Sequence, residues 1–517
     1  CMKAPVARFM PDRSPFTLEA SPQQLNVVPT ADGVEPLPGP NSVTPLLGFL
    51  TDEDGNPIIN EATGDYIVTG PDGAALVGEV LLPGAAKGAF YGRLADGTDI
   101  RIVGTTDALY RVDTTEKTFI DISGPDAPYN VPANGFWSFR QFGTTVYAQN
   151  GVDDEQMFDI ASDTAFSTNA TAPVAKYLIV TNDRLHRLCL ASNNSEQQWS
   201  GLNDPTYNVV GLRGCDEQVQ PIGNGITGGV DMSFGAIIFL RNAIRRMDYS
   251  GVSQWIYQFS TVSSERGAVS PGSICKIGDD DFVFYAHDGF FRGLSMTPIG
   301  AERIDKWFAA NTDGSARVNM TSALDKKRKV VWFRFTASNG ANWCLGYQWQ
   351  INEWLLTDAP LACLFTVETA AITIDGLADI FETIDDIDVP FDSSFWDGGA
   401  IELGAITDDG YYAILNGPNM KATIISNQAA DEGHQRFRVN SGRMDSDAVN
   451  GSFTLSTADV KGGTFRDRNA VSPSSRTGKI PFNADGRVFR VTSEIPEGEP
   501  WTYFGGLYLA EQSSGLQ

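Results

Sequence analysis

The residues of this chain that could act as catalytic acids or bases are two groups of clustered aspartates. Asp279 to Asp281 form the denser group, and Asp385, Asp386 and Asp388 form the other. A glycosidase needs two carboxylates that converge on one glycosidic bond. Adjacent acids instead point to alternate faces of a strand or project from a turn, so we interpret both groups as solvated turns.

No other residues show a catalytic or metal-binding spacing. His186, His287 and His434 are isolated in the sequence, so we expect core or surface positions for them. Residues 223–229 read GNGITGG but lack the Lys-Ser/Thr pair of a phosphate-binding loop. There is neither a G-x-S-x-G nucleophile elbow nor the S-x-D-x-G-x-x-W repeat of sialidase-type propellers. We therefore expect a protein that is not an enzyme, without catalytic, cofactor-binding or metal-binding residues.

The cysteines and the hydropathy pattern indicate a compartment. No C-x-x-C pair occurs, which predicts free and mostly buried thiols in a protein made in a reducing cytosol. There is no apolar run of about 18 residues and no charged-then-apolar leader, so we expect neither a membrane span nor a signal peptide. The six cysteines are Cys1, Cys189, Cys215, Cys275, Cys344 and Cys363.

The net charge of −26 comes from 38 basic and 64 acidic residues. It argues against wrapping duplex DNA, because phosphate neutralisation needs dense Lys and Arg. It is compatible with DNA that passes through a channel whose acidic wall repels phosphate. The basic run Lys326 to Lys329 predicts a turn that leads into a strand, with a phosphate contact as the minor alternative. From Asp431 onward the chain is nearly neutral, which indicates a separate C-terminal module.

Short apolar strands separated by Gly, Asn and Asp turns recur about every 40 to 50 residues, which is the period of four-stranded propeller blades. One small sheet cannot bury both of its faces alone, so blades stack around an axis and share their cores. About seven unequal units begin near Arg101, Gly135, Lys176, Gly228, Gln258, Arg328 and Ala362.

The clearest unit runs from Gln258 to Phe308. Residues 282–287 alternate between two faces, and Asp288-Gly289 predicts a tight turn before the return strand. The unit ends in a predicted short amphipathic helix, with Glu302 in its first turn. The apolar face of that helix, at spacings of three and four residues, consists of Ile304, Trp307 and Phe308.

These patterns predict a mainly β chain with three parts. Residues 1–95 form an extended Pro-rich arm and a β-hairpin platform region, since Pro lacks the donor that a sheet interior needs. Residues 96–428 form a β-propeller of about six to seven irregular blades. Residues 429–517 form a small C-terminal β-sandwich module. We expect the arm to pack on a neighbouring domain or subunit.

Single residues in the outer parts also carry expectations. Asp52 to Gly55 lacks the further oxygen ligands of a calcium loop, so we interpret it as a plain turn. In the C-terminal module we expect Trp501 in the core. Arg487 and Arg490 flank Val488 and are expected on the faces of its strand, in solvated or inter-subunit ion pairs.

Several segments resemble the tail nozzle proteins of short-tailed bacteriophages, also called tail hub or packaged-DNA-stabilisation proteins. They are QQWSGLNDPTYNV (Gln197 to Val209), SSERGAVSPGSI (Ser263 to Ile274) with HDGFFR (His287 to Arg292), and IGAERIDKWF (Ile299 to Phe308). The ending DGRVFRVTSEIPEGEPWTYFGGLYL is similar to the closing module of that group. The resemblance covers roughly residues 100 to 360 and, less closely, 435 to 510. Its motifs are turns and blade edges, and no catalytic signature is among them.

The resemblance implies a homo-hexameric tube below the portal and head-to-tail adaptor rings of a virion tail, assembled in the cytoplasm of the host bacterium. The propeller would form the wall, a gate would retain the packaged genomic DNA until infection, and the outer face would dock tail fibres or spikes. The alternative is a glycan-binding or glycan-cleaving propeller in host recognition, which predicts aromatic residues and paired acids at one propeller mouth. A scaffold propeller with a peptide partner is the third interpretation.

Overall fold

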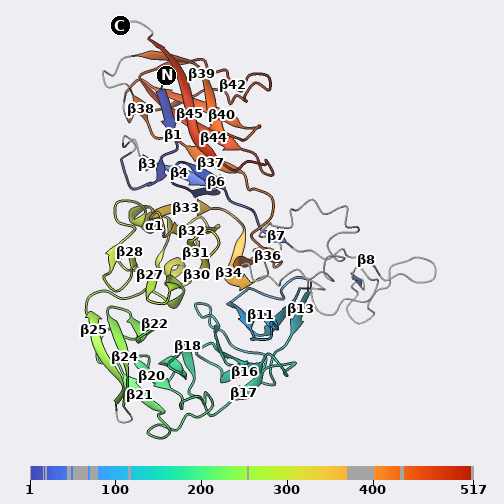
Figure 1. Ribbon diagram of the computed structural model, residues 1–517, viewed down its shortest axis with the longest axis vertical. Helices are drawn as coiled ribbons and strands as arrows, with labels where there is room; N and C mark the ends of the chain where they lie inside the picture. The colour runs from blue at the N-terminus through green and yellow to red at the C-terminus, as the bar shows by residue number, and fades with distance from the viewer. Residues whose placement is uncertain are drawn as a thin grey trace, which may run out of the picture.

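The structure is a computed structural model that describes residues 2–14, 17, 20–42, 48–49, 68–69, 80–114, 118–252, 255–368, 401–430, 436–460 and 462–513. These residues build two β-rich parts, which Figure 1 shows one above the other. A ring of small sheets forms the lower part of the view, and a β-sandwich that contains both the first strand and the last strand forms the upper part.

The ring is a closed β-propeller. The described residues form seven antiparallel four-stranded sheets, and the innermost strands of successive sheets lie side by side until the seventh meets the first. The predicted mainly β propeller is thus confirmed, with blade number at the upper end of the predicted range. The strands are, for blade 1, β10 (Ala89–Arg93), β11 (Asp99–Gly104), β12 (Leu109–Asp113) and β13 (Thr118–Asp121); for blade 2, β14 (Ser138–Phe142), β15 (Thr145–Gln149), β16 (Glu155–Asp159) and β17 (Ser167–Asn169); for blade 3, β18 (Ala175–Thr181), β19 (Arg184–Leu190), β20 (Glu196–Trp199) and β21 (Asp216–Val219); for blade 4, β22 (Ile226–Met232), β23 (Gly235–Leu240), β24 (Ile244–Val252) and β25 (Trp255–Ser263); for blade 5, β26 (Ile274–Gly278), β27 (Asp281–Ala286), β28 (Gly289–Arg292) and β29 (Thr297–Pro298); for blade 6, β30 (Thr321–Asp325), β31 (Val330–Thr336), β32 (Asn342–Gln348) and β33 (Glu353–Thr357); and for blade 7, β34 (Leu361–Glu368), β35 (Ile401–Thr407), β36 (Tyr412–Ile414) and β7 (Asn41–Ser42).

Each pair of neighbouring blades shares a hydrophobic core. Phe284 of β27 contacts Phe239 of blade 4, with ring centroids 5.2 Å apart. The other face of the same sheet meets blade 6, where the rings of Phe290 and Phe333 are 5.2 Å apart. The predicted alternation in β27 is therefore present, but both faces of the strand are buried because a blade lies on each side.

The ring closes between segments that are distant in the sequence. The outermost strand of blade 7 is β7, whose Asn41 and Ser42 pair with Ile414 and Ala413 of β36. A strand from the N-terminal arm thus completes the sheet formed by the last propeller segment. Blade 7 meets blade 1 through the contact between their innermost strands, β34 and β10, and the described part of the arm is a structural component of blade 7.

The upper part in Figure 1 is a sandwich of two sheets drawn from both ends of the chain. Its core contains Trp501, which is 3% exposed, as predicted. The first sheet comprises β1 (Met2–Pro5), β5 (Val27–Pro29), β6 (Val34–Pro36), β39 (Phe437–Ser446), β42 (Lys479–Ile480), β43 (Ala484–Gly486) and β45 (Phe504–Ser513), and the second comprises β4 (Gln23–Leu25), β37 (Ala422–Ile425), β38 (Ala429–Ala430), β40 (Ser452–Ala458), β41 (Arg466–Asp467) and β44 (Val488–Ile495).

The borders between the propeller and its flanking parts, as strand pairing defines them, differ from those predicted from composition. The first blade begins at Ala89, before the expected border at residue 95, and β37 joins the sandwich although the propeller was expected to extend to residue 428. The arm also contributes four strands to the sandwich, so these described strands do not form a separate region. The physical reason is that short strands pair with whichever sheet edge lies nearby, which local composition does not record.

The remaining elements are short. They are the parallel pair β2 (Arg8–Phe9) and β3 (Ala20–Ser21), the pair β8 (Gly48–Phe49) and β9 (Val68–Thr69), the 3₁₀ turn η1 (Pro271–Ser273), and the helices α1 (Asp305–Asn311) and α2 (Gly314–Val318). Across the described ranges, no helix has the length and apolar character needed to cross a membrane.

The predicted amphipathic helix exists as α1, but it starts later than expected. Asp305 lies in its first turn, whereas Glu302 precedes the helix with φ of +59°. The expected position of Glu302 is therefore wrong, since a left-handed backbone cannot continue into an α-helical turn. Ile304 and Phe308 are fully buried and Trp307 is half-buried, so the apolar face is present as predicted.

Candidate functional site

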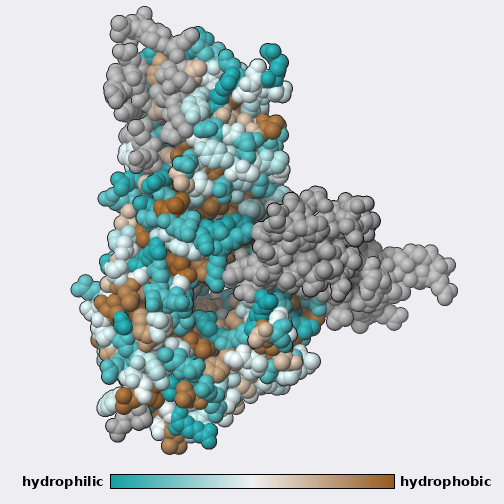
Figure 2. All heavy atoms as spheres, viewed as in Figure 1, coloured by the Kyte–Doolittle hydropathy of each residue, from teal (hydrophilic) through white to brown (hydrophobic). Residues whose placement is uncertain are grey.

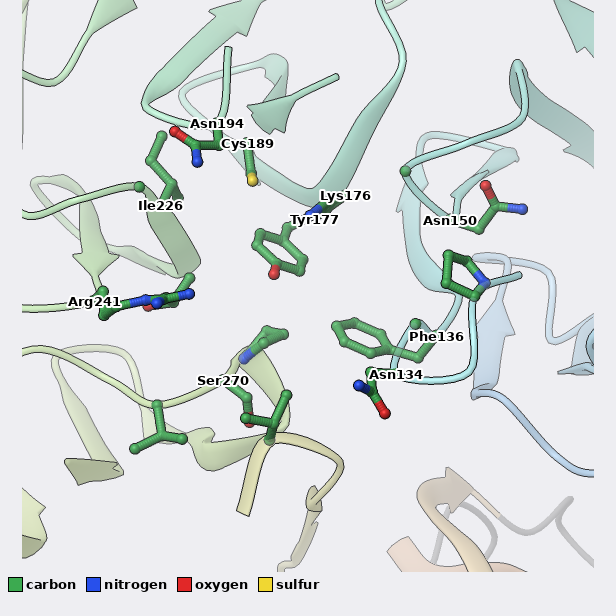
Figure 3. Close-up of a pocket in the computed structure, with 18 of the residues that line it drawn as sticks. Asn134, Phe136, Asn150, Lys176, Tyr177, Cys189, Asn194, Ile226, Arg241 and Ser270 are labelled. Carbon is green, nitrogen blue, oxygen red and sulfur yellow. The ribbon is translucent and has the colours of Figure 1, made fainter. Parts of the chain in front are cut away.

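A cavity of about 360 Å³ opens at one mouth of the propeller, between blades 2 and 5 (Figure 3). Its walls are the loops that lead into the innermost strands and the loops that join the second and third strands of blades 2 to 4. Side chains from different blades meet there because the ring brings equivalent loops to the same face. The size lies in the range of about 300 to 1,000 Å³ that is typical of small-molecule sites.

Two aromatic rings form one wall of the cavity. Phe136 precedes β14, and Tyr177 lies in β18, where it pairs with Leu188. The two rings are nearly parallel, at an interplanar angle of 11° and a centroid distance of 5.8 Å. Burial raises the pKa of the Tyr177 hydroxyl, so the phenol is neutral at physiological pH and can both donate and accept a hydrogen bond.

Two cations border the same space. Lys176 precedes Tyr177 in β18, and Arg241 follows β23. Both residues are exposed, and the side chain of Arg241 points towards Tyr177 in Figure 3. The Arg241 charge opposes the rise in the pKa of the Tyr177 hydroxyl, which places the guanidinium within electrostatic reach of the ring. Among the described residues that line the cavity, none is acidic.

Asparagines complete the polar part of the lining. Asn134 accepts a hydrogen bond of 3.0 Å from Asn319, and Asn150 donates one of 2.7 Å to Asp153. Asn194 lies in the loop between β19 and β20 of blade 3, and Asn224 lies just before β22 of blade 4 with a backbone φ of +59°. The cavity therefore presents amides, two cations and an aromatic pair, which is a set that suits ligand binding, and its described lining contains no carboxylate.

A second surface feature lies at the outer side of blades 3 and 4. We call it the blade 3–4 edge and define it by eight apolar side chains that are 41% to 69% exposed. It lies at the lower left of Figure 1, where β21, β24 and β25 are labelled, and Figure 2 shows apolar residues at that border of the molecule. The eight residues are Leu202, Val209, Val210, Leu212, Val219, Tyr249, Val252 and Trp255.

A buried arginine holds the loop that carries half of this edge. Arg187 donates hydrogen bonds of 2.7 Å to Asn208 Oδ1 and 2.9 Å to the carbonyl of Pro205. Gln198 Nε2 donates another, of 2.8 Å, to the carbonyl of Asn208. These contacts fix residues 200–215 on blade 3, so the exposed apolar residues of the loop are presented by an ordered backbone.

The clustered aspartates at positions 279–281 form structural contacts or lie in a turn. Asp280 accepts hydrogen bonds from the backbone N–H and the hydroxyl of Ser233, at 3.1 and 2.6 Å, and so connects blade 5 to blade 4. Asp281 forms a salt bridge of 2.7 Å with Arg292. Asp279 is exposed in the turn between β26 and β27. The group Asp385, Asp386 and Asp388 lies outside the described residues, as does Asp52 to Gly55.

The histidines and cysteines that the structure describes take the positions that their isolation predicts. His186 is fully buried and its Nε2 lies 3.0 Å from the Tyr257 hydroxyl, while His287 is exposed in a turn and His434 lies outside the described ranges. Within those ranges, no group of His, Cys, Asp or Glu is placed to hold a metal ion. Cys1 is also outside them, and the buried free thiols are Cys189, Cys215, Cys275, Cys344 and Cys363.

The basic run and the two C-terminal arginines also have structural contacts. Lys326 to Lys329 forms the turn between β30 and β31, as predicted. Within it Arg328 pairs with Asp325 at 2.9 Å and Lys327 with Glu402 at 3.3 Å. Arg490 lies over the ring of Phe465, with its guanidinium carbon 4.6 Å from the ring centroid. The expected ion pairs of Arg487 and Arg490 remain predictions.

Sequence reasoning did not identify the cavity residues. Phe136, Lys176, Tyr177 and Arg241 are far apart in the sequence and share no motif. The signal that was available is positional, because Phe136 lies just before a blade strand, Lys176 and Tyr177 at the start of one and Arg241 just after one, all on the same face. Of the glycine-rich stretch that was rejected as a phosphate loop, Asn224 to Thr227 line the cavity.

The fold assignment rests on the strand pairing, because comparisons with known proteins give only distant likenesses. No protein-family model matches the sequence, and no curated protein matches it. The extracellular domain of a one-component system from B. thetaiotaomicron aligns at 9% identity with a TM-score of 0.39, over 78% of this chain and 46% of that chain. BamB from Moraxella catarrhalis aligns at 12% identity and a TM-score of 0.26, over 52% and 94%. An exo-beta-1,3-galactanase from Phanerochaete chrysosporium aligns at 10% identity and 0.25, over 91% and 100%. The chain therefore spans about half of the first of these structures, and likenesses this distant carry no argument about function.

Proposed function

We propose that this chain is a non-enzymatic structural subunit of the tail of a short-tailed bacteriophage. Six copies form a nozzle below the portal and the head-to-tail adaptor, which conducts and gates the genomic DNA and docks tail fibres or spikes on its outer face. The starting point is the set of segments that resemble nozzle proteins. The resemblance implies a propeller that forms the wall of the tube, and the presence of a propeller in this chain supports the proposal.

The observation that carries the proposal is the blade 3–4 edge. Large apolar side chains that gather on one part of a surface mark contacts with other proteins. Trp255 is 69% exposed and Leu212 57% exposed, and both project from ordered elements. The segment Gln197 to Val209, which carries part of the resemblance, leads directly into this edge. We assign the edge to the contact with the neighbouring copy, because rings are built from repeated heterologous contacts of this kind.

The charge of the chain is consistent with the role of a conduit. A net charge of −26 disfavours adhesion of phosphate to the protein. DNA can then move past a wall of this kind without being retained by it. The proposal therefore predicts passage of genomic DNA without sequence-specific binding.

The test is the assembly state of the full-length chain, measured by mass photometry and by electron microscopy, alone and with adaptor-bearing phage heads. The expected result is a six-membered ring, or assembly of six copies on the adaptor. Leu212→Ser and Trp255→Ser should weaken the ring, because each removes apolar area from the contact. The matched control is Val449→Ser, which changes a 73% exposed valine in the sandwich.

A chain that stays monomeric at micromolar concentration and does not join the adaptor would overturn the proposal. If the ring is equally intact in Leu212→Ser, Trp255→Ser and Val449→Ser, the blade 3–4 edge is not the contact between copies. Loss of the ring in the control variant as well would show a general loss of stability, which differential scanning calorimetry of the three variants measures directly.

The cavity favours a second candidate function, a propeller that binds a glycan. The aromatic pair Phe136 and Tyr177 and the asparagines are groups that sugars contact. Cleavage of a glycan by two carboxylates is not proposed for this mouth, because its described lining contains no Asp or Glu. An array of bacterial surface glycans probed with the labelled full-length chain tests this candidate, and a blank array counts against it.

A further inference from the structure

We propose that the cavity at the propeller mouth binds a small sugar acid, whose carboxylate is held by Arg241 and Lys176 and whose ring lies against Phe136 and Tyr177. The inference names the ligand class for the second candidate function and rests on that candidate. It does not depend on ring assembly, so the two proposals can fail separately. None of the residues that line the cavity belongs to the blade 3–4 edge.

The first step is the local reversal of charge. The chain as a whole carries −26, yet the described lining of the cavity holds two basic residues and no acidic one. In a protein of this composition, a pocket without carboxylates attracts anions in preference to its surroundings. The anions that a guanidinium binds best are carboxylates and phosphates, because their oxygens accept two of its N–H groups in parallel.

The second step is that the polar groups are available. Within the described chain, no hydrogen bond or ion pair engages the side chains of Lys176 and Arg241 or the hydroxyl of Tyr177. Figure 3 shows Arg241 and Tyr177 directed towards the same space. Convergent polar groups without protein partners, set in a concave surface, are the usual mark of a ligand site.

The third step is the aromatic wall, which distinguishes a sugar from a bare anion. The parallel rings of Phe136 and Tyr177 present an apolar surface beside the cations. Inorganic phosphate or acetate gains nothing from such a surface, whereas the C–H face of a pyranose packs on it. The volume of about 360 Å³ admits one or two sugar units. Asn134 and Asn224, which also line the cavity, supply amide groups for ring hydroxyls.

A strand of nucleic acid fits these observations less well. Proteins that hold single strands without sequence preference use a basic groove that follows many phosphates. Here the basic groups number two within the described lining, and the rest of the chain is strongly acidic. Nucleic acid is therefore an outcome that the experiment must discriminate and is not the proposed ligand.

The test is isothermal titration calorimetry of the full-length chain with five probes: digalacturonic acid, the matching neutral digalactose, galactose 6-phosphate, acetate and a short oligodeoxynucleotide. The expected result is binding of digalacturonic acid that is at least about tenfold tighter than binding of any other probe. Arg241→Gln and Lys176→Gln should each weaken it by about tenfold or more, since each removes a charge-assisted contact. Phe136→Ala should weaken the acidic and the neutral disaccharide alike.

The matched control is Lys326→Gln. Lys326 is an exposed lysine in the turn between the first and second strands of blade 6, on the opposite face of the ring. This variant should bind digalacturonic acid as the unchanged protein does. Thermal unfolding of each variant checks that the propeller is intact, because Arg241 and Lys176 are exposed and their replacement should leave the melting temperature unchanged within about 2 °C.

Four results would overturn the inference. Equal affinity for the neutral and acidic disaccharides would remove the role of the cations, and tighter binding of galactose 6-phosphate would assign the site to phosphate. Tighter binding of a short oligodeoxynucleotide in the same titration would assign it to nucleic acid. Absence of heat for every probe at millimolar concentration would show that the cavity takes no sugar acid. In each case the ring assembly proposed above is unaffected.

Discussion

Arg187 of β19 donates two hydrogen bonds of 2.7 Å to the carboxylate of Glu155 of β16, and both side chains are fully buried between blades 2 and 3. Glu155 also accepts hydrogen bonds of 2.9 Å from Gln149 and Asn169. The apolar core between these two blades is small, comprising Tyr147, Leu178 and Leu185 as its fully buried members. At this junction an ion pair with a satisfied network occupies the space that hydrophobic side chains fill elsewhere in the ring.

Replacing one partner of this pair should strongly destabilise the propeller. Arg187→Met leaves the Glu155 carboxylate buried without its cation, which costs about 3 to 5 kcal/mol of unfolding free energy. The double variant Arg187→Met with Glu155→Leu should lose less than the single variant, because no uncompensated charge remains. Urea unfolding followed by Trp fluorescence measures both values. The control Lys421→Gln breaks a more exposed pair with Glu494 and should change the free energy by less than about 1 kcal/mol. A double variant that is less stable than Arg187→Met would contradict this account.

His186 should make the protein sensitive to acid. Burial, with smaller contributions from the charges of Arg184 and Arg187, lowers its pKa from 6.5 to about 3. A depressed pKa means that its contribution to stability is complete above pH 6.5 and is lost as the pH falls towards 3. His186→Gln retains a group that can bond the Tyr257 hydroxyl but does not titrate. Between pH 6.5 and pH 4.5, we expect the free energy of unfolding of the variant to fall by about 2 kcal/mol less than that of the unchanged protein. Identical losses in urea titrations at the two pH values would exclude this role for His186.

Asp305 should act in the opposite direction. Burial is the main cause that raises its pKa from 3.8 to about 6, with additions from Asp12 and Asp288, against a hydrogen bond of 3.1 Å from the Phe290 N–H. A raised pKa means that the contribution to stability is complete below pH 3.8 and is lost as the pH rises through 6. Asp305→Asn retains the acceptor for Phe290 without the charge. It should raise the free energy of unfolding by about 1 to 2 kcal/mol at pH 7.5, allowing for solvent screening, and by almost nothing at pH 3.5. Stability curves of variant and unchanged protein that run parallel from pH 3.5 to 7.5 would refute the assignment.

The repeated blades could be predicted because their signal is local. Alternating apolar residues and Gly or Asp turns mark strands such as β11, β12 and β13 wherever they occur. The limits of a blade carry no such mark. The unit that begins at Gln258 therefore contains the end of β25, which closes blade 4, as well as all of blade 5.

The closure of the ring and the cavity could not be predicted, because both depend on contacts between distant segments. β7 consists of Asn41 and Ser42, which have no strand pattern of their own and are ordered by pairing with β36. Phe136, Tyr177 and Arg241 become neighbours only when blades 2, 3 and 4 are stacked in a ring. Their spacing in the sequence reflects blade length and carries no chemical motif.

Asn26 should couple the propeller to the sandwich. Its side-chain N–H groups donate hydrogen bonds of 2.8 Å to Asp358 at the end of blade 6 and 2.9 Å to the carbonyl of Lys421 at the start of the sandwich strand β37. Its own backbone N–H donates one of 2.9 Å to the carbonyl of Leu356, and its φ is +61°. Removal of the amide takes both hydrogen bonds away at a residue that is itself buried, so the two parts should unfold less cooperatively. Differential scanning calorimetry of Asn26→Gly should then show two resolved transitions where the unchanged protein shows one.

Asn26→Ala provides the matched comparison, because it removes the same hydrogen bonds and adds backbone strain. A β-carbon other than that of Asn or Asp is disfavoured at positive φ by about 1 kcal/mol, whereas glycine tolerates it. We therefore expect the Ala variant to melt below the Gly variant by a few degrees, with the same split into two transitions. Equal melting temperatures would show that the strain is relieved by movement of the arm. A single transition in both variants would show that the contacts of β33 in blade 6 with β4 and β5 of the sandwich suffice to couple the two parts without Asn26.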